Sequence, residues 1–99
     1  SMNNLFISYD LNQPGQNYER VIEAIKTLGN WAKVQKSFWY VRSSLSASQA
    51  LERLKPAIDR SDSLIVVDST NDAAAWQGVS HEVSEHMRKH WSSGAYAMR

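Results

Sequence analysis

The acidic residue whose position most favours chemistry is Asp10, which follows the short apolar run at residues 5–7. Such a run is typical of a buried strand, and Pro14-Gly15 marks a turn soon after it. A carboxylate at a strand end, just before a helix, is a frequent place for catalysis or binding. A turn aspartate that bonds to loop amides is more frequent still, so both interpretations of Asp10 stay open.

A second group of ionisable residues lies near the C-terminus, in the run from His81 to His86. A zinc-protease helix needs histidines at positions i and i+4, but Glu85 occupies the second of these positions, so the motif is absent. Glu82, His86 and His90 do recur on one side of a predicted helix and can form a metal site. A solvated face opposite the apolar stripe is the more common arrangement.

The segment at residues 31–42 combines basic and aromatic side chains. Lys33, Lys36 and Arg42 give it positive charge beside the aromatic pair Trp39-Tyr40. This combination can hold single-stranded nucleic acid, because bases stack on aromatic rings while cations bind phosphates. Aromatic residues of this kind are more often part of a core or of a dimer interface.

The first half of the chain is predicted to form a strand, a helix and a hairpin. Apolar residues recur at helical spacing over 18–28, with Asn17 as the N-terminal cap and Gly29 as a left-handed C-terminal cap. Residues 31–35 and 37–42 are rich in β-branched and aromatic side chains and predict two strands joined by a tight turn.

The second half adds a helix, a strand and a further helix. Ser46 and Gln49 form a capping-box pattern, and Pro56 should end that helix shortly before it, with one further turn after it. The continuous apolar run at 64–67 is typical of a strand covered on both faces. Residues 73–76 favour a helical turn.

This order of elements predicts one α+β domain with the ferredoxin-like βαββαβ topology. The strands would form a four-stranded antiparallel sheet in the order 4-1-3-2, and a C-terminal helix would follow at about 79–91. The domain would span residues 2–92, with its core at 4–68, and residues 93–99 would form a frayed tail.

In this topology, one end of the sheet gathers several polar residues, while Asp68 lies at the opposite end. Their proximity depends on strand pairing rather than on sequence separation. The residues expected at the shared end are Asp10, Gln35, Lys36, Ser37 and Asp62.

Composition narrows the possible functions. The net charge of +1 is far from that of a strongly basic nucleic-acid binder, so any such contact needs a local patch or an oligomer. The chain has no cysteine, which excludes disulfides and thiolate metal sites. No apolar run approaches the roughly 18 residues of a membrane span, so we expect a cytoplasmic protein with no membrane role. The four tryptophans favour homodimerisation, because they suggest an apolar surface that needs cover.

Several of these features together resemble the small CRISPR-associated adaptation proteins. They are Asp10 at the end of the first strand, the hairpin at 34–38 and the helix start at Leu45-Ser46. The related virulence-associated ribonuclease toxins share this outline. The fuller pattern of YDLN-x-PGQNY, G-x-W, S-x-W and AAAW-x-G is similar to a bacterial branch sometimes labelled SinR-like.

The resemblance implies a ferredoxin-like homodimer that acts as a metal-dependent nuclease in some members and as an integration scaffold in others. It assigns Asp10 as a Mg²⁺ ligand, with a second carboxylate from the symmetry-related subunit. Ser37 would orient a phosphate or water beside Asp10 as the second catalytic residue. Four cations would bind the RNA or DNA, namely Arg20, Lys33, Lys36 and Arg42.

Three functions follow as alternatives. The near-zero net charge favours a non-enzymatic, nucleic-acid-linked scaffold or regulator, as does the presence of Arg20 alone where the adaptation proteins carry a basic pair. A Mg²⁺-dependent endonuclease that uses Asp10 is the second possibility. The third is a small-ligand or sequestering module at the loop 12–17, where Gly15 and helix-start amides can hold a phosphate.

Overall fold

The computed structural model describes residues 2–12 and 18–91 of the chain. The expected Pro14-Gly15 turn, the Asn17 cap, most of the loop proposed for a small ligand and the tail at 93–99 lie outside the described residues. None of the helices within the described part combines the length and the apolar character that crossing a bilayer requires.

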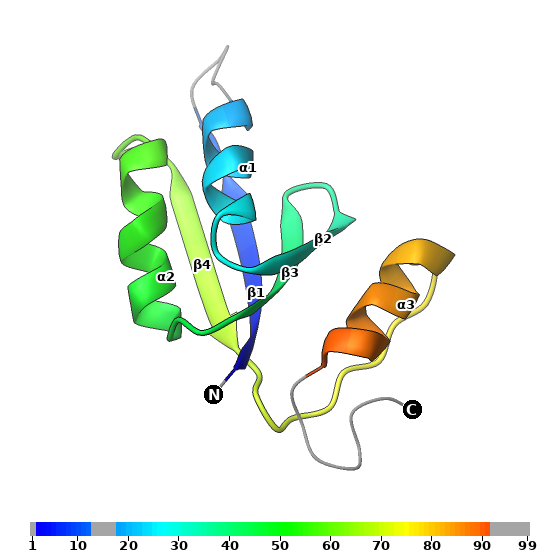
Figure 1. Ribbon diagram of the computed structural model, residues 1–99. Coiled ribbons are helices and arrows are strands. Elements are labelled where there is room, and N and C mark those ends of the chain that lie inside the picture. Colours follow the sequence, from blue (N-terminus) through cyan, green and yellow to red (C-terminus); the bar gives the residue numbers. More distant parts are fainter. Residues whose placement is uncertain (1, 13–17, 92–99) are drawn as a thin grey trace.

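The predicted α+β ferredoxin-like fold is confirmed. A four-stranded antiparallel sheet has the order β2-β3-β1-β4, which is the expected order read from the other edge. Helices cover it, and α3 is the expected C-terminal addition (Figure 1). The elements are β1 (Asn3–Asp10), α1 (Tyr18–Lys26), β2 (Asn30–Gln35), β3 (Phe38–Ser43), α2 (Ala47–Leu54), the 3-10 helix η1 (Lys55–Ala57), β4 (Ser63–Asp68) and α3 (His81–His90).

The larger core lies between the sheet and the layer formed by α1 and α2. Alternate residues of β1 and β3 point into this layer, because side chains of a strand alternate between its two faces. The apolar stripes of the two helices meet them there (Figure 1). The residues at the centre of this core have no exposed surface and include Leu5, Ile7, Val21, Ile25 and Leu54.

The opposite face of the sheet carries a smaller aromatic core under α3. Tyr40 is fully buried there, and the single proton of its hydroxyl is shared between two acceptors, Oδ1 of Asn4 at 2.9 Å and the carbonyl of His90 at 3.0 Å. The ring of Trp91 stacks on that of Tyr40, with a centroid distance of 5.6 Å. Met87 completes the cluster. These contacts fix the end of α3 to the middle of the sheet.

The tryptophans therefore serve the core more than an external surface. Trp39 and Trp91 are buried, and the indole N–H of Trp91 donates to the carbonyl of Asp72 at 2.9 Å. Trp76 is half-buried, and only Trp31 among the four is 40% exposed. The tryptophan count is thus largely explained by packing within one chain.

Two expectations for the segment between α2 and α3 are wrong. The strand at 64–67 is not covered on both faces, because β4 lies at the edge of the sheet, beyond the reach of α3. Ile65 is 60% exposed and Val67 is 49% exposed. Residues 73–76 form no helical turn but run as irregular chain between β4 and α3.

The start and end of α2 follow the sequence signals. The side chain of Ser46 accepts a hydrogen bond from the N–H of Gln49, and the side chain of Gln49 accepts one from the N–H of Ser46. The helix ends at Leu54, and η1 supplies the further turn around Pro56.

Gly29 is required for close packing rather than for a left-handed cap. Its φ of 159° is extended, so the expected left-handed conformation is not adopted. A Cβ at this position would overlap the backbone carbonyl of Arg42, on the neighbouring strand β3. The chain can pass from α1 into β2 along this path only without a side chain.

We expect Gly29→Ala to lower the free energy of unfolding by about 1–3 kcal/mol, the usual cost of overpacking, because the rigid Arg42 carbonyl must move. Urea unfolding followed by circular dichroism measures this change. Gly78→Ala is the comparison, since Gly78 has a left-handed φ of 78° but open space around it. An equal or smaller loss for Gly29→Ala than for Gly78→Ala would contradict the steric explanation.

Candidate functional site

The structure brings Asp10 and Ser37 together at one end of the sheet. Asp10 is exposed at the end of β1 and pairs with Ser63 of β4. The N–H of Tyr9 donates a hydrogen bond of 3.2 Å to the carbonyl of Ser37, so the turn between β2 and β3 lies beside Asp10. Ser37 closes this turn with a left-handed φ of 59°. We call this region the polar end of the sheet.

Asp62 lies at the same end and holds the adjoining loops together. Its Oδ1 accepts a hydrogen bond from the N–H of Asn12 at 2.9 Å, and its Oδ2 accepts one from the N–H of Asp59 at 2.7 Å. The carboxylate seen to bind loop amides is therefore Asp62. The residues at 13–17, whose amides were the alternative partners of Asp10, lie outside the described residues.

A divalent cation would find an incomplete ligand set at Asp10 in a single chain. Mg²⁺ prefers nearly octahedral oxygen ligands from carboxylates, waters and substrate phosphates. Within residues 2–12 and 18–91, no three acidic or histidine side chains come together in a way that could hold a metal ion. A cation at Asp10 would therefore depend on a second subunit or on substrate phosphates for its remaining ligands.

The four candidate nucleic-acid-binding cations lie in different parts of the fold. Lys36 is exposed in the turn at the polar end of the sheet. Arg42 lies near the other end of β3, and Lys33 lies on the edge strand β2. Arg20, on α1, donates a hydrogen bond of 2.7 Å to the carbonyl of Pro56 on the helical side. Lys36 is thus the member of this set that lies beside Asp10.

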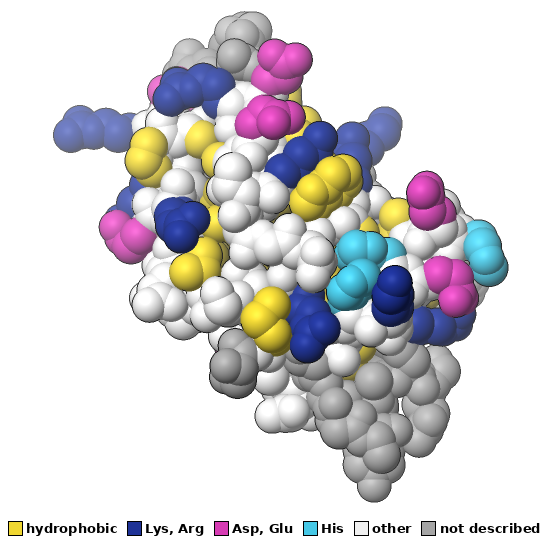
Figure 2. Space-filling view, viewed as in Figure 1, with side chains coloured by type: hydrophobic (Ala, Val, Ile, Leu, Met, Phe, Trp, Pro, Cys, Tyr) yellow, Lys and Arg dark blue, Asp and Glu magenta, His cyan; other side chains and the backbone are white. Residues whose placement is uncertain are grey.

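A cavity of about 410 Å³ opens between β2 and α3, and the ring of His86 forms part of its wall. The ring centroid of His86 lies 4.3 Å from that of His90 and 6.2 Å from that of Tyr40. Figure 2 shows histidine side chains on α3 next to lysine or arginine. The cavity is lined by Trp31, Ala32, Lys33, Glu82, Val83 and His86.

His86 does not belong to a solvated helix face, as the sequence had suggested. Its Nε2 is buried and has no hydrogen-bond partner among the described residues, although the backbone of Asn30 approaches the ring. Burial lowers the pKa of His86 from its usual 6.5, and the charges of His90 and Lys89 lower it further, while the Asn30 backbone acts in the opposite direction. Glu82, His86 and His90 do not form a metal site.

On the sheet face opposite α1 and α2, α3 leaves β4 uncovered, and Ile65 and Val67 are exposed there. Phe6 and Phe38 lie next to them and stack in parallel with ring centroids 5.3 Å apart, while Phe6 also contacts the ring of Trp91 at 5.7 Å. Asp10 lies on the same face as Phe6, because side chains two and four residues apart in a strand share a face. We call this surface the open half-face.

The open half-face was not among the candidate surfaces that the sequence pattern indicated. The alternation that puts Phe6 and Asp10 on one face is visible in the sequence, and Phe38 follows the same rule in its own strand. The run at 64–67 gave no such alternation, and nothing in the sequence showed how little of this face α3 would cover.

Comparison with known proteins supports the fold. No family model matches the chain, and no curated protein matches its sequence. A solved structure described as a crystal structure of Cas2 is similar to it, with a TM-score of 0.50 and 23% sequence identity. The match covers 82% of this chain and 93% of the Cas2 chain. At this identity the likeness shows a shared ferredoxin-like fold.

The position of His86 predicts a pH-dependent stability. Its folded-state pKa is lower than the unfolded value of about 6.5, so the unfolded chain takes up a proton first as the pH falls. The free energy of unfolding should therefore decrease as the pH is lowered through 6.5 towards the folded-state pKa. His86→Gln should reduce this decrease, which urea unfolding at a series of pH values measures.

The matched control is His81→Gln, because His81 is exposed at the start of the same helix. If both variants keep the full pH dependence of the wild type, burial of His86 is not its cause.

Proposed function

We propose that this protein is a homodimeric scaffold or regulator linked to nucleic acid, of the kind found among the small CRISPR-associated adaptation proteins. The fold shared with Cas2 supports this proposal, together with Asp10 at the end of β1 and the Gln35-Lys36-Ser37 turn beside it. Asp10, Lys36 and Ser37 would face the nucleic acid, and bacteria would be the source that the SinR-like pattern suggests.

The observation that carries the dimer is the open half-face. Ile65 and Val67 expose 60% and 49% of their surface on an edge strand, where a monomer gains nothing from them. Contiguous exposed apolar surface of this kind marks an interaction site. A two-fold axis beside β4 lets each subunit offer Ile65 and Val67 to the other and leaves Phe6 and Phe38 outside the contact.

An axis that runs along the strands would bring the two Asp10 residues to the same end of the dimer, at the rim of the contact, since Asp10 ends β1 on this face. Two facing carboxylates can supply the ligands that a single chain lacks. The Mg²⁺-dependent endonuclease is therefore the alternative function, and it depends on the same dimer.

We expect the wild type to sediment at about twice the 11.2 kDa of one chain and Ile65→Asp to sediment as a monomer, because a buried, unpaired carboxylate would oppose association. Analytical ultracentrifugation measures both. Ser48→Asp, on the exposed side of α2, adds the same charge elsewhere and should remain a dimer. A monomeric wild type at all concentrations would refute the dimer.

Lys36→Gln should weaken binding of single-stranded nucleic acid and reduce the steepness of its salt dependence by about 0.7, the value for one phosphate contact. Fluorescence anisotropy at several salt concentrations measures this slope. Lys55→Gln is the control, because Lys55 lies on η1 and pairs with Glu52 at 2.8 Å. An unchanged slope in Lys36→Gln would remove Lys36 from the interface.

The scaffold and the endonuclease differ in the outcome of a cleavage assay. A scaffold should leave labelled RNA and DNA intact with Mg²⁺, and Asp10→Asn should change stability or binding but no cleavage rate. Mg²⁺-dependent cleavage by the wild type that is lost in Asp10→Asn would establish the endonuclease instead.

A further inference from the structure

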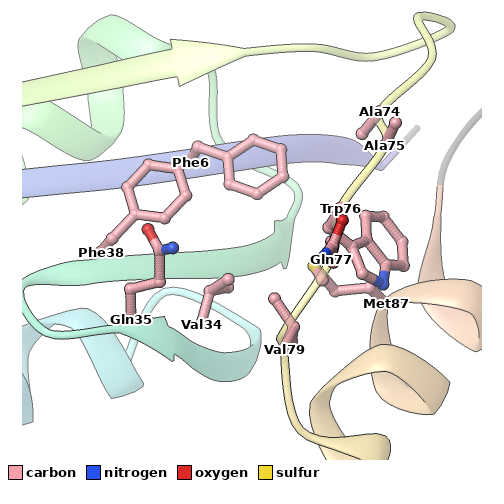
Figure 3. A pocket seen from close by; sticks show the side chains of 10 residues that line it. All are labelled: Phe6, Val34, Gln35, Phe38, Ala74, Ala75, Trp76, Gln77, Val79 and Met87. Atoms are coloured by element: carbon pink, nitrogen blue, oxygen red, sulfur yellow. The ribbon is translucent and has the colours of Figure 1, made fainter.

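A cavity of about 410 Å³ lies on the open side of the sheet, between the strands and the irregular segment at 74–79 (Figure 3). Its volume is in the range of roughly 300–1,000 Å³ that is usual for small-ligand sites. It lies on the β2–β3 side of the face, whereas Ile65 and Val67 lie on β4. Its walls are formed by Phe6, Val34, Gln35, Phe38, Ala74, Ala75, Trp76, Gln77, Val79 and Met87.

The floor of the cavity contains an offset stack of two aromatic rings. The rings of Phe6 and Phe38 differ in orientation by only 6°, with centroids 5.3 Å apart, and both are half-buried. Figure 3 shows the two rings nearly face-on, one beside the other. In an offset stack the outer face of each ring stays free, so another planar group can extend the stack.

Aromatic residues in these positions have a precedent in RNA recognition. The RNA-recognition motif also uses a four-stranded sheet, whose aromatic side chains stack on two or three bases. Here Phe6 lies on β1 and Phe38 on β3, the two central strands of the sheet. The face that carries them is the one that α1 and α2 leave free.

Two amide side chains supply polar groups at the edges of this aromatic surface. Gln35 extends from β2 towards the ring of Phe38, and Gln77 lies on the opposite wall near Trp76 (Figure 3). Among the described residues, neither amide makes a hydrogen bond within the protein. Each therefore has a donor and an acceptor to offer, as the edge of a nucleobase requires.

The charge of the walls limits the ligand further. Within residues 2–12 and 18–91, the cavity is lined by no acidic, basic or histidine side chain, which favours a neutral group for the part of a ligand that enters it. The indole N–H of Trp76 does not add a polar group to the cavity, because it donates a hydrogen bond of 3.0 Å to the hydroxyl of Ser84. A phosphate would remain outside.

We propose that this cavity binds a nucleobase that extends the stack of Phe6 and Phe38 and is held at its edge by Gln35 and Gln77. The base belongs to a single strand of nucleic acid or to a free nucleoside. The inference deepens the proposed function and depends on it for the choice of ligand, since it adds base contacts to the phosphate contacts of Lys36. It leaves β4 available for the second subunit.

The test compares three probes by fluorescence anisotropy and by tryptophan fluorescence: a short single-stranded RNA, the same strand made entirely of abasic nucleotides, and adenosine. The wild type should bind the intact strand more tightly than the abasic strand. Phe38→Leu keeps an apolar side chain but removes the ring, and it should weaken binding of the intact strand about tenfold, the order expected for one stacked base.

Gln35→Glu should also weaken binding, because it places a negative charge at the cavity wall. Each variant has a matched control outside the cavity: Tyr18→Leu removes an exposed ring from α1, and Ser48→Glu adds the same charge to α2. Both controls should bind the intact strand as the wild type does. Circular dichroism checks that every variant is folded.

The outcomes separate this inference from the proposed function. Wild-type affinity for the intact strand in both Phe38→Leu and Gln35→Glu, or equal affinity of the wild type for the abasic strand, refutes the base site and leaves the scaffold in place. Binding of adenosine that Phe38→Leu weakens, with no binding of the strand, keeps the base site and refutes the nucleic-acid scaffold. Failure to bind any of the three probes refutes both.

Discussion

The structure depends on a sheet whose central strands carry large side chains on both faces. Ile7 and Trp39 point to one side, and Phe6 and Tyr40 point to the other, so each face must be covered for the sheet to be stable. Two helices cover the first face. The second receives only α3, which packs beside β2, so the area towards β4 stays open. The candidate interfaces of the molecule lie on this second face, because the helices cover it less completely than the first.

Tyr40 fixes α3 to the second face. Burial raises its pKa to about 12, so the hydroxyl keeps its proton and shares it between Asn4 and the end of α3. The same anchoring holds His86 against the sheet, where its ring loses water. Packing of α3 therefore leaves the aromatic floor of Phe6 and Phe38 open while it buries an ionisable group next to β2.

The sequence was sufficient for the fold because local signals and topology agreed. The capping box at Ser46, the break at Pro56 and the hairpin at 34–38 each belong to one short segment. What it could not predict depends on contacts between distant segments. The exposure of Ile65 follows from its place at the sheet edge, and the role of Gly29 follows from the carbonyl of Arg42 on the next strand. Likewise, nothing local distinguishes residues 73–76 as irregular chain across a sheet face.

Asp62 and Asp10 both lie at the polar end of the sheet, but they differ in whether their oxygens are available to a ligand. Asp62 has both oxygens engaged by backbone amides of the loops, so its charge already stabilises the chain itself. Asp10 is exposed at the rim of the surface that a second subunit would cover. One exposed carboxylate is a poor cation site, whereas two brought together repel each other unless a cation or a proton lies between them. Association through the open half-face would therefore couple dimer stability to the charge at Asp10, whether or not the dimer cleaves nucleic acid.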